Sequence, residues 1–133
     1  ALLFNKTKNL LAFPVSVAEI KNKDPKNPVT DGEIVFRGAY VYSLDLEKGF
    51  QLKAKVTHFD ETQPIGYTSD GAQGQPYYGV NSLMIQRLIY IGNTFYSISL
   101  GKVQANALAD FSKQGETTLT SEEDGGGGGP ILY

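Results

Sequence analysis

Apolar and polar residues alternate most clearly in residues 83–100, LMIQRLIYIGNTFYSISL. Residues 84–91 are almost wholly apolar, Gly92-Asn93 is a turn signal, and the residues after it alternate. Successive side chains of a strand point to opposite faces, so this pattern predicts an antiparallel hairpin. Its second strand places Tyr96, Ile98 and Leu100 on one face, with Phe95, Ser97 and Ser99 on the other. The apolar run 84–91 further predicts that this strand is covered on both faces.

Similar alternation predicts further strands at residues 10–17, 38–46 and 50–59. Shorter or weaker strands are expected at 1–4, 33–36, 101–109 and 116–120. In the strand at 50–59, Phe50, Leu52, Ala54 and Val56 should share one face. Lys53 and Lys55 lie opposite, and lysine commonly protects a sheet edge from pairing with another chain. This strand is therefore expected at the edge of its sheet.

The strands fall into two units of four, because residues 41–56 and 103–119 repeat the same outline of strand, polar turn and strand. We expect one blade at 1–59, a loop at 60–80 and a second blade at 81–120. An acidic, glycine-rich tail at 121–133 should be flexible. Four-stranded antiparallel units in tandem are typical of β-propeller blades. The predicted fold is all-β: two four-stranded sheets packed as a partial propeller or as a sandwich.

Composition narrows the classes of function. The 133 residues suit one domain, and 41% of them are hydrophobic, which is enough for a core. A net charge of -2 disfavours a nucleic-acid binder, and no apolar run reaches the length of a transmembrane helix. The absence of cysteine excludes disulfides, zinc–thiolate sites and a cysteine nucleophile.

Three segments carry a family resemblance: FNKTKNLLAFPVSV, GAYVYSLDLEKGFQLKAKVTH and LIYIGNTFYSIS. Together they resemble the C-terminal part of large secreted β-propeller-domain proteins of archaea and some bacteria, over residues 2–119. The resemblance implies an extracellular or cell-surface location and brings no agreed chemistry. Two blades cannot close a ring, so we expect a fragment, a short relative or one piece of an assembly. An exposed blade face or edge strand could then recruit a protein partner or a second copy.

His58, the only histidine, is followed closely by Asp60 and Glu61 in the sequence HFDE. Such a group could bind a metal or form the remnant of a hydrolase site. However, His58 matches the end of the fourth strand in the resembled family, which favours a structural role. Asp60, Glu61 and Asp70 could also supply oxygen ligands to calcium, but no calcium-loop pattern is present, so solvated loop acids are favoured. The sequence predicts no catalytic residue and no cofactor.

The loop at 64–80 contains Tyr67, Tyr77 and Tyr78 among glycine, glutamine and proline. Tyrosine provides contact area at a low entropic cost, so this loop could bind a carbohydrate or a peptide. The simpler alternative is that these rings cover the end of a sheet. The leading prediction is a non-catalytic interaction or structural module outside the cytoplasm.

Overall fold

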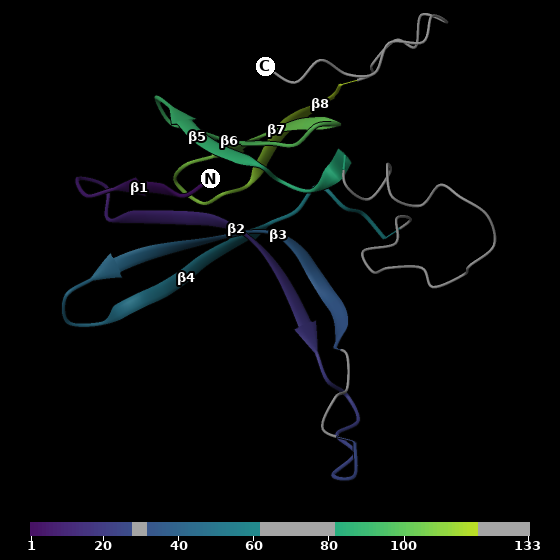
Figure 1. The fold of residues 1–133 in the computed structure, drawn as a ribbon. Coiled ribbons are helices and arrows are strands. Elements are labelled where there is room, and N and C mark those ends of the chain that lie inside the picture. The colour runs from purple at the N-terminus through teal and green to yellow at the C-terminus, as the bar shows by residue number, and fades with distance from the viewer. Residues whose placement is uncertain (28–31, 62–81, 120–133) are drawn as a thin grey trace, which may run out of the picture.

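The computed structural model describes residues 1–27, 32–61 and 82–119. These form two four-stranded antiparallel sheets, in the orders β1-β2-β3-β4 and β5-β6-β7-β8 (Figure 1). The first sheet contains β1 (Leu3–Asn5), β2 (Leu10–Glu19), β3 (Glu33–Asp45) and β4 (Gly49–Val56). The second sheet contains β5 (Arg87–Ile91), β6 (Thr94–Ile98), β7 (Lys102–Ala107) and β8 (Lys113–Thr118). The all-β prediction of two four-stranded sheets is confirmed, as is the edge position of β4.

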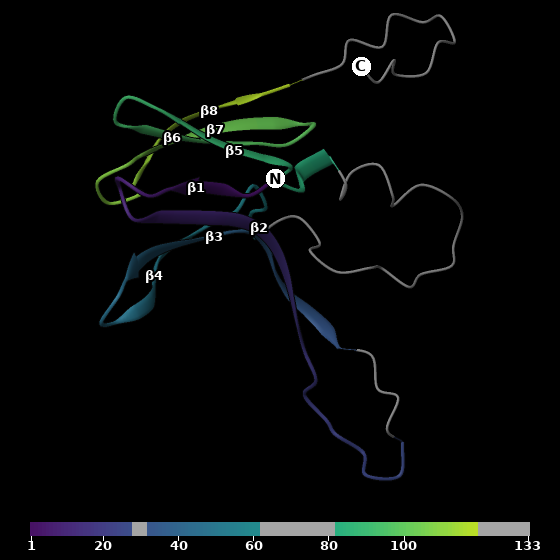
Figure 2. The same cartoon turned by 60° about the vertical axis from the view of Figure 1, so that its left-hand side comes forward.

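The two sheets stack face to face (Figures 1 and 2). The core contains buried residues of both sheets. Ala12, Ala39 and Val41 of the first sheet are fully buried, and so is Phe95 of the second. One cluster of buried residues spans both sheets: Leu10, Ala12, Ala39, Val41, Val56, Ile85, Leu88 and Phe95. The core thus combines small side chains of the first sheet with the large Phe95 ring of the second.

A β-bulge in β4 corrects the predicted face of that strand. Val41 pairs with Ala54 but Tyr42 pairs with Leu52, which leaves Lys53 as an extra residue. A bulge of one residue reverses the faces of the side chains on either side of it. Val56 consequently faces the core, whereas Phe50 lies on the opposite face and is 70% exposed.

Several predicted strand boundaries were wrong; for example, the strand expected at 50–59 ends at Val56. The expected strand at 33–36 and its neighbour at 38–46 form one continuous strand, because β2 pairs with β3 along its whole length. The last strand begins at Lys113 rather than at residue 116, because its pairing with β7 continues through a bulge. The strand expected at 84–91 begins only at Arg87. Met84 and Ile85 precede the strand and contact other parts of the molecule. Ile85 belongs to the core cluster, and the Met84 sulfur accepts a hydrogen bond from Arg37 at 3.9 Å.

The described residues cover one face of this strand, and the expected cover of its other face lies outside what they show. Leu88 is buried against the first sheet, but Ile89 and Ile91 of β5 are exposed on the other face. Register places Ile89 beside Tyr96, and Tyr96 beside Ala105. The outer face of the second sheet is therefore an apolar surface that faces away from the core.

Candidate functional site: the His58 contact between the sheets

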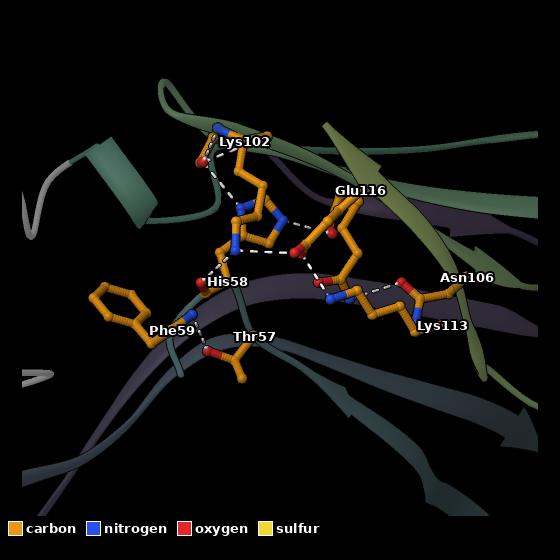
Figure 3. A network of polar contacts seen from close by, with 10 residues as sticks. Thr57, His58, Phe59, Lys102, Asn106, Lys113 and Glu116 are labelled. Carbon is orange, nitrogen blue, oxygen red and sulfur yellow. Dashed lines mark hydrogen bonds and ion pairs between the residues drawn. The ribbon is translucent and has the colours of Figure 1, made fainter. Parts of the chain in front are cut away.

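His58 lies just beyond the end of β4, where the chain turns toward the second sheet (Figure 3). Thr57 fixes this turn, because its hydroxyl donates to the Arg37 carbonyl at 2.6 Å and accepts from the Phe59 amide at 3.1 Å. The turn directs the imidazole into the interior, where His58 is only 2% exposed.

Two serines of the second sheet hold the imidazole ring. Nδ1 lies 2.9 Å from the Ser99 hydroxyl, and Nε2 lies 2.8 Å from the Ser97 hydroxyl. The Ser99 hydroxyl also donates to the Lys102 carbonyl and accepts from the Lys102 amide. One tautomer satisfies all these contacts: Nδ1–H donates to Ser99, while Nε2 accepts from Ser97.

Burial lowers the pKa of His58 to about 4, and the nearby positive charge of Lys102 acts in the same direction. A hydrogen bond to the Ser97 backbone and the negative charge of Glu116 oppose this change without cancelling it. The imidazole is therefore neutral at physiological pH, which agrees with one donating and one accepting ring nitrogen.

A charged group of the second sheet closes the site on one side (Figure 3). The Lys102 ammonium donates to the His58 carbonyl at 3.2 Å and pairs with Glu116 at 3.3 Å. Glu116 also pairs with Lys113 at 2.7 Å, and this hydrogen bond lowers the pKa of the Glu116 carboxyl. The second sheet thus holds the segment after β4 by both side-chain and backbone contacts.

The Ser97–His58 pair has the donor and acceptor of a nucleophile and its base, but its surroundings differ from those of a hydrolase site. Ser97 is fully buried, so its hydroxyl does not face solvent. The group that orients His58 is the Ser99 hydroxyl rather than a carboxylate. A nucleophile must reach its substrate, so this geometry supports cross-sheet attachment rather than chemistry.

The other candidate residues lie elsewhere. Asp60 and Glu61 are exposed, whereas His58 is buried. Within the part of the chain that the structure describes, no cluster of three histidine, cysteine or acidic residues could hold a metal. The calcium candidate Asp70 and the recognition candidates Tyr67, Tyr77 and Tyr78 lie outside the described residues. The predicted loop at 60–80 and tail at 121–133 also lie largely or wholly outside them.

Sequence reasoning missed Ser97, Ser99 and Lys102 as partners of His58. A signal was present, since Ser97 and Ser99 share a strand face with Phe95, and two hydroxyls beside a large core residue need hydrogen-bond partners. Gln104 and Asn106 continue this buried polar row on β7, where the Gln104 amide donates to Asn106 at 3.1 Å.

A second candidate feature is the outer aromatic face of the first sheet, defined as the rings of Phe13, Phe36, Tyr40, Tyr42 and Phe50. The rings form a connected series, with Tyr42 contacting Phe13, Tyr40 and Phe50 at centroid distances of 5.8, 6.2 and 6.3 Å. The Lys55 ammonium lies over the Phe36 and Tyr40 rings. Figures 1 and 2 show no other described strand on this side of the sheet.

Two consecutive four-stranded antiparallel sheets, each in sequential strand order and stacked on one another, define a pair of β-propeller-type blades. A family model described as a beta propeller domain matches residues 1–111, and the chain belongs to this family. Comparisons with curated proteins and with solved structures found no significant match. Among the described residues, no helix is long and apolar enough to span a membrane.

Proposed function

We propose that this chain is a non-catalytic structural and interaction module that assembles by stacking a further blade on the outer aromatic face. The observation that carries this proposal is the apolar character of both faces of the first sheet. Its inner face packs on the second sheet, while its outer face presents Phe13, Tyr42 and Phe50. Monomeric proteins rarely expose large contiguous apolar patches, so such a face typically marks an interface.

A second copy of the chain is the proposed partner, bound through the outer face of its second sheet. On that face Tyr96 lies between Ile89 and Ala105, and the small residues Ala105 and Gly115 follow toward the β8 edge. A side-chain carbon placed on Gly115 would meet nothing within 4 Å, so this part of the surface is open. The low surface at Ala105 and Gly115, next to the Tyr96 ring, leaves room for the bulky rings of the other surface. The inner interface has a similar contrast, because its core cluster combines Phe95 with Ala12 and Ala39.

The two outer surfaces differ, so this contact would be head to tail. Head-to-tail contacts close into rings when their rotation allows it, and two copies would provide four blades. Four is the smallest number in the usual range for a propeller. Face stacking is favoured over strand addition at β4, because Lys53 and Lys55 lie on that edge strand.

Two arguments support the remaining parts of the proposal. The absence of catalysis is supported by His58, which is buried and uses both ring nitrogens in hydrogen bonds. A location outside the cytoplasm is supported by the resemblance of residues 2–119 to secreted propeller proteins. Fractionation of cells that make the protein, followed by immunoblotting, tests the location; recovery in the cytoplasmic fraction alone would exclude it.

Assembly can be tested by light scattering and sedimentation over a range of concentrations. Phe50→Glu should abolish association through the first sheet, and Ile91→Glu should abolish it through the second. Both side chains are exposed, 70% and 65%, so neither change should unfold the chain. Leu46→Glu is the matched control, because Leu46 is fully exposed in the β3–β4 turn and away from both faces.

Mixing the two variants distinguishes head-to-tail from symmetric contact. Each variant alone should be monomeric, whereas an equimolar mixture should form a one-to-one complex through the two intact faces. Association of Ile91→Glu by itself would indicate that two aromatic faces meet, which contradicts the proposed partner. A wild-type chain that stays monomeric at millimolar concentration would overturn the assembly proposal.

A further inference from the structure

A cleft of about 780 Å³ lies between the two sheets, at the end of the molecule opposite His58. It is bordered by the β1–β2, β5–β6 and β7–β8 turns, so both sheets contribute to it. Its volume lies within the usual range for small-ligand sites, which often occur between structural units. The cleft is separate from both outer faces, so an inference about it does not depend on the proposed assembly.

The walls of the cleft are fixed by hydrogen bonds. Asn9 and Phe111 are the described non-glycine residues with positive φ, at 49° and 59°, and both line the cleft. The Asn9 carbonyl accepts from the Leu44 amide at 2.9 Å. The Phe111 carbonyl accepts from the Asn106 side chain at 2.8 Å, and its ring packs against Phe95. Asn adopts the left-handed backbone readily, but for Phe111 it is costly and persists only where the surroundings hold it, so this wall of the cleft is preformed.

The lining combines an apolar base with a cationic rim. Leu10, Leu108 and Phe111 supply apolar surface from both sheets. Lys8 and Lys53 bring positive charge from the first sheet. Lys53 is the extra residue of the β4 bulge, and bulges commonly redirect a side chain next to a site.

The acidic group of the cleft is already engaged. The Asp110 carboxylate accepts from the Ser112 amide at 3.0 Å and from the Ser112 hydroxyl at 2.7 Å, and these bonds lower its pKa. The lowered pKa keeps Asp110 ionised, so the two lysines of the cleft exceed its single negative charge by one. The Ser43 hydroxyl and the side-chain amide of Asn93 add neutral hydrogen-bonding groups to the lining.

We propose that this inter-sheet cleft binds an apolar carboxylic acid. The apolar body of the ligand would rest on Leu10, Leu108 and Phe111, and its carboxylate would lie between Lys8 and Lys53. A free aromatic acid and an acidic, apolar peptide share this chemistry. In both cases the desolvated hydrocarbon supplies most of the affinity, and the lysines select the anion.

The test is a titration of the nitrogen-15-labelled chain monitored by NMR. One arm uses 3-phenylpropanoate, and the other uses the blocked peptide acetyl-Leu-Glu-Leu-amide. Binding should shift the amide signals of Asn9, Asn93 and Leu108. Stronger binding in one arm identifies the source of the acid. The neutral analogues, 3-phenylpropanamide and acetyl-Leu-Gln-Leu-amide, should bind more weakly than the matching acids.

Matched lysine variants locate the carboxylate. Lys8→Gln and Lys53→Gln should each weaken acid binding by about threefold, and together by about tenfold, as expected for exposed ion pairs. Lys6→Gln, in the same turn as Lys8, and Lys55→Gln, two residues from Lys53 and on the aromatic face, should leave it unchanged. No binding of either acid, equal binding of the amides, or equal effects of Lys55→Gln and Lys53→Gln would each overturn the proposal.

Discussion

The Nε2 atom of His58 lies 2.8 Å from the Ser97 hydroxyl, and this contact joins the end of the first sheet to a middle strand of the second. Both side chains are buried, so each polar atom depends on the other for its hydrogen bond. A buried polar contact of this kind contributes mainly through the cost of breaking it, because an unpaired group cannot regain its bonds to water. His58 thus makes the stacking of the two blades specific.

Removing either partner of this contact should destabilise the chain. We expect Ser97→Ala to lower the free energy of unfolding by about 1–3 kcal/mol, because it leaves Nε2 without its donor. His58→Ala should cost about 2–4 kcal/mol, since it also leaves a cavity. In urea denaturation, the double variant should show a coupling free energy of at least about 0.5 kcal/mol. Glu61→Ala, at an exposed neighbouring position, is the control; strict additivity of the two core changes would contradict the contact.

The lowered pKa of His58 predicts a pH dependence of stability. The unfolded chain takes up the proton near pH 6.5, whereas the folded chain takes it up only near pH 4. Acid therefore favours the unfolded state between these values, and stability should fall as the pH decreases from about 6.5 to about 4, with a total loss of at most about 3 kcal/mol. Below that range His58 causes no further loss.

Glu116 also contributes to the loss of stability in acid. The pKa of its carboxyl is lowered in the folded chain, so the stabilisation that it provides is lost as the pH falls toward more acidic values. Comparison of wild type with His58→Gln in urea, at half-unit steps from pH 7.5 to 3.5, isolates the histidine. The difference between the two curves should change between pH 6.5 and 4. A difference that is constant over this range would show that His58 does not become protonated on unfolding.

Substitutions at two phenylalanines of very different exposure should distinguish an effect on stability from an effect on assembly. Phe95 is fully buried at the centre of the core, so Phe95→Ala should cost about 3–5 kcal/mol. Phe50→Ala, on the exposed outer aromatic face, should change the stability of the monomer by less than about 0.5 kcal/mol. Urea denaturation at low protein concentration measures both. A large loss of stability in the Phe50 variant would mean that this face is covered within one chain.

Two glycines give a similarly sharp contrast. A side-chain carbon at Gly38 would lie 2.1 Å from the Val56 carbonyl oxygen and 2.7 Å from the Phe36 ring. A backbone oxygen cannot move aside easily, so Gly38→Ala should cost at least about 2 kcal/mol. Gly115 has open space at the same position, and Gly115→Ala should be neutral or stabilising by up to about 1 kcal/mol. Thermal unfolding measured by circular dichroism, below the association range, compares them; similar effects at both sites would contradict the close approach at Gly38.

Most of the candidate site could not be predicted from the sequence. The HFDE segment drew attention to His58 with Asp60 and Glu61, yet the hydrogen-bond partners of His58 are 39 and 41 positions further along the chain. A sequence shows which residues are neighbours along the chain. It does not show which strands pack together, and that packing decides which residues are buried. The calcium and tyrosine predictions at Asp70, Tyr67, Tyr77 and Tyr78 stay predictions, since these residues are outside the described ranges.

The sequence by itself determined the all-β fold and the division into two four-stranded units, because alternation with a period of two and local turn signals act over a few residues. It also separated the two faces of β6, where Phe95 and Ser97, with Ser99 just after the strand, share the buried side. Only the tertiary structure decided which face of β3 turned inward. Val41 and Tyr42 lie on opposite faces of this strand, and both faces are apolar. The tertiary structure also decided where β4 bulges, since FQLKAKV alternates without interruption in the sequence. The face with Ala12, Ala39 and Val41 is inside, where it forms one buried cluster with Phe95, and that cluster joins residues more than 50 positions apart.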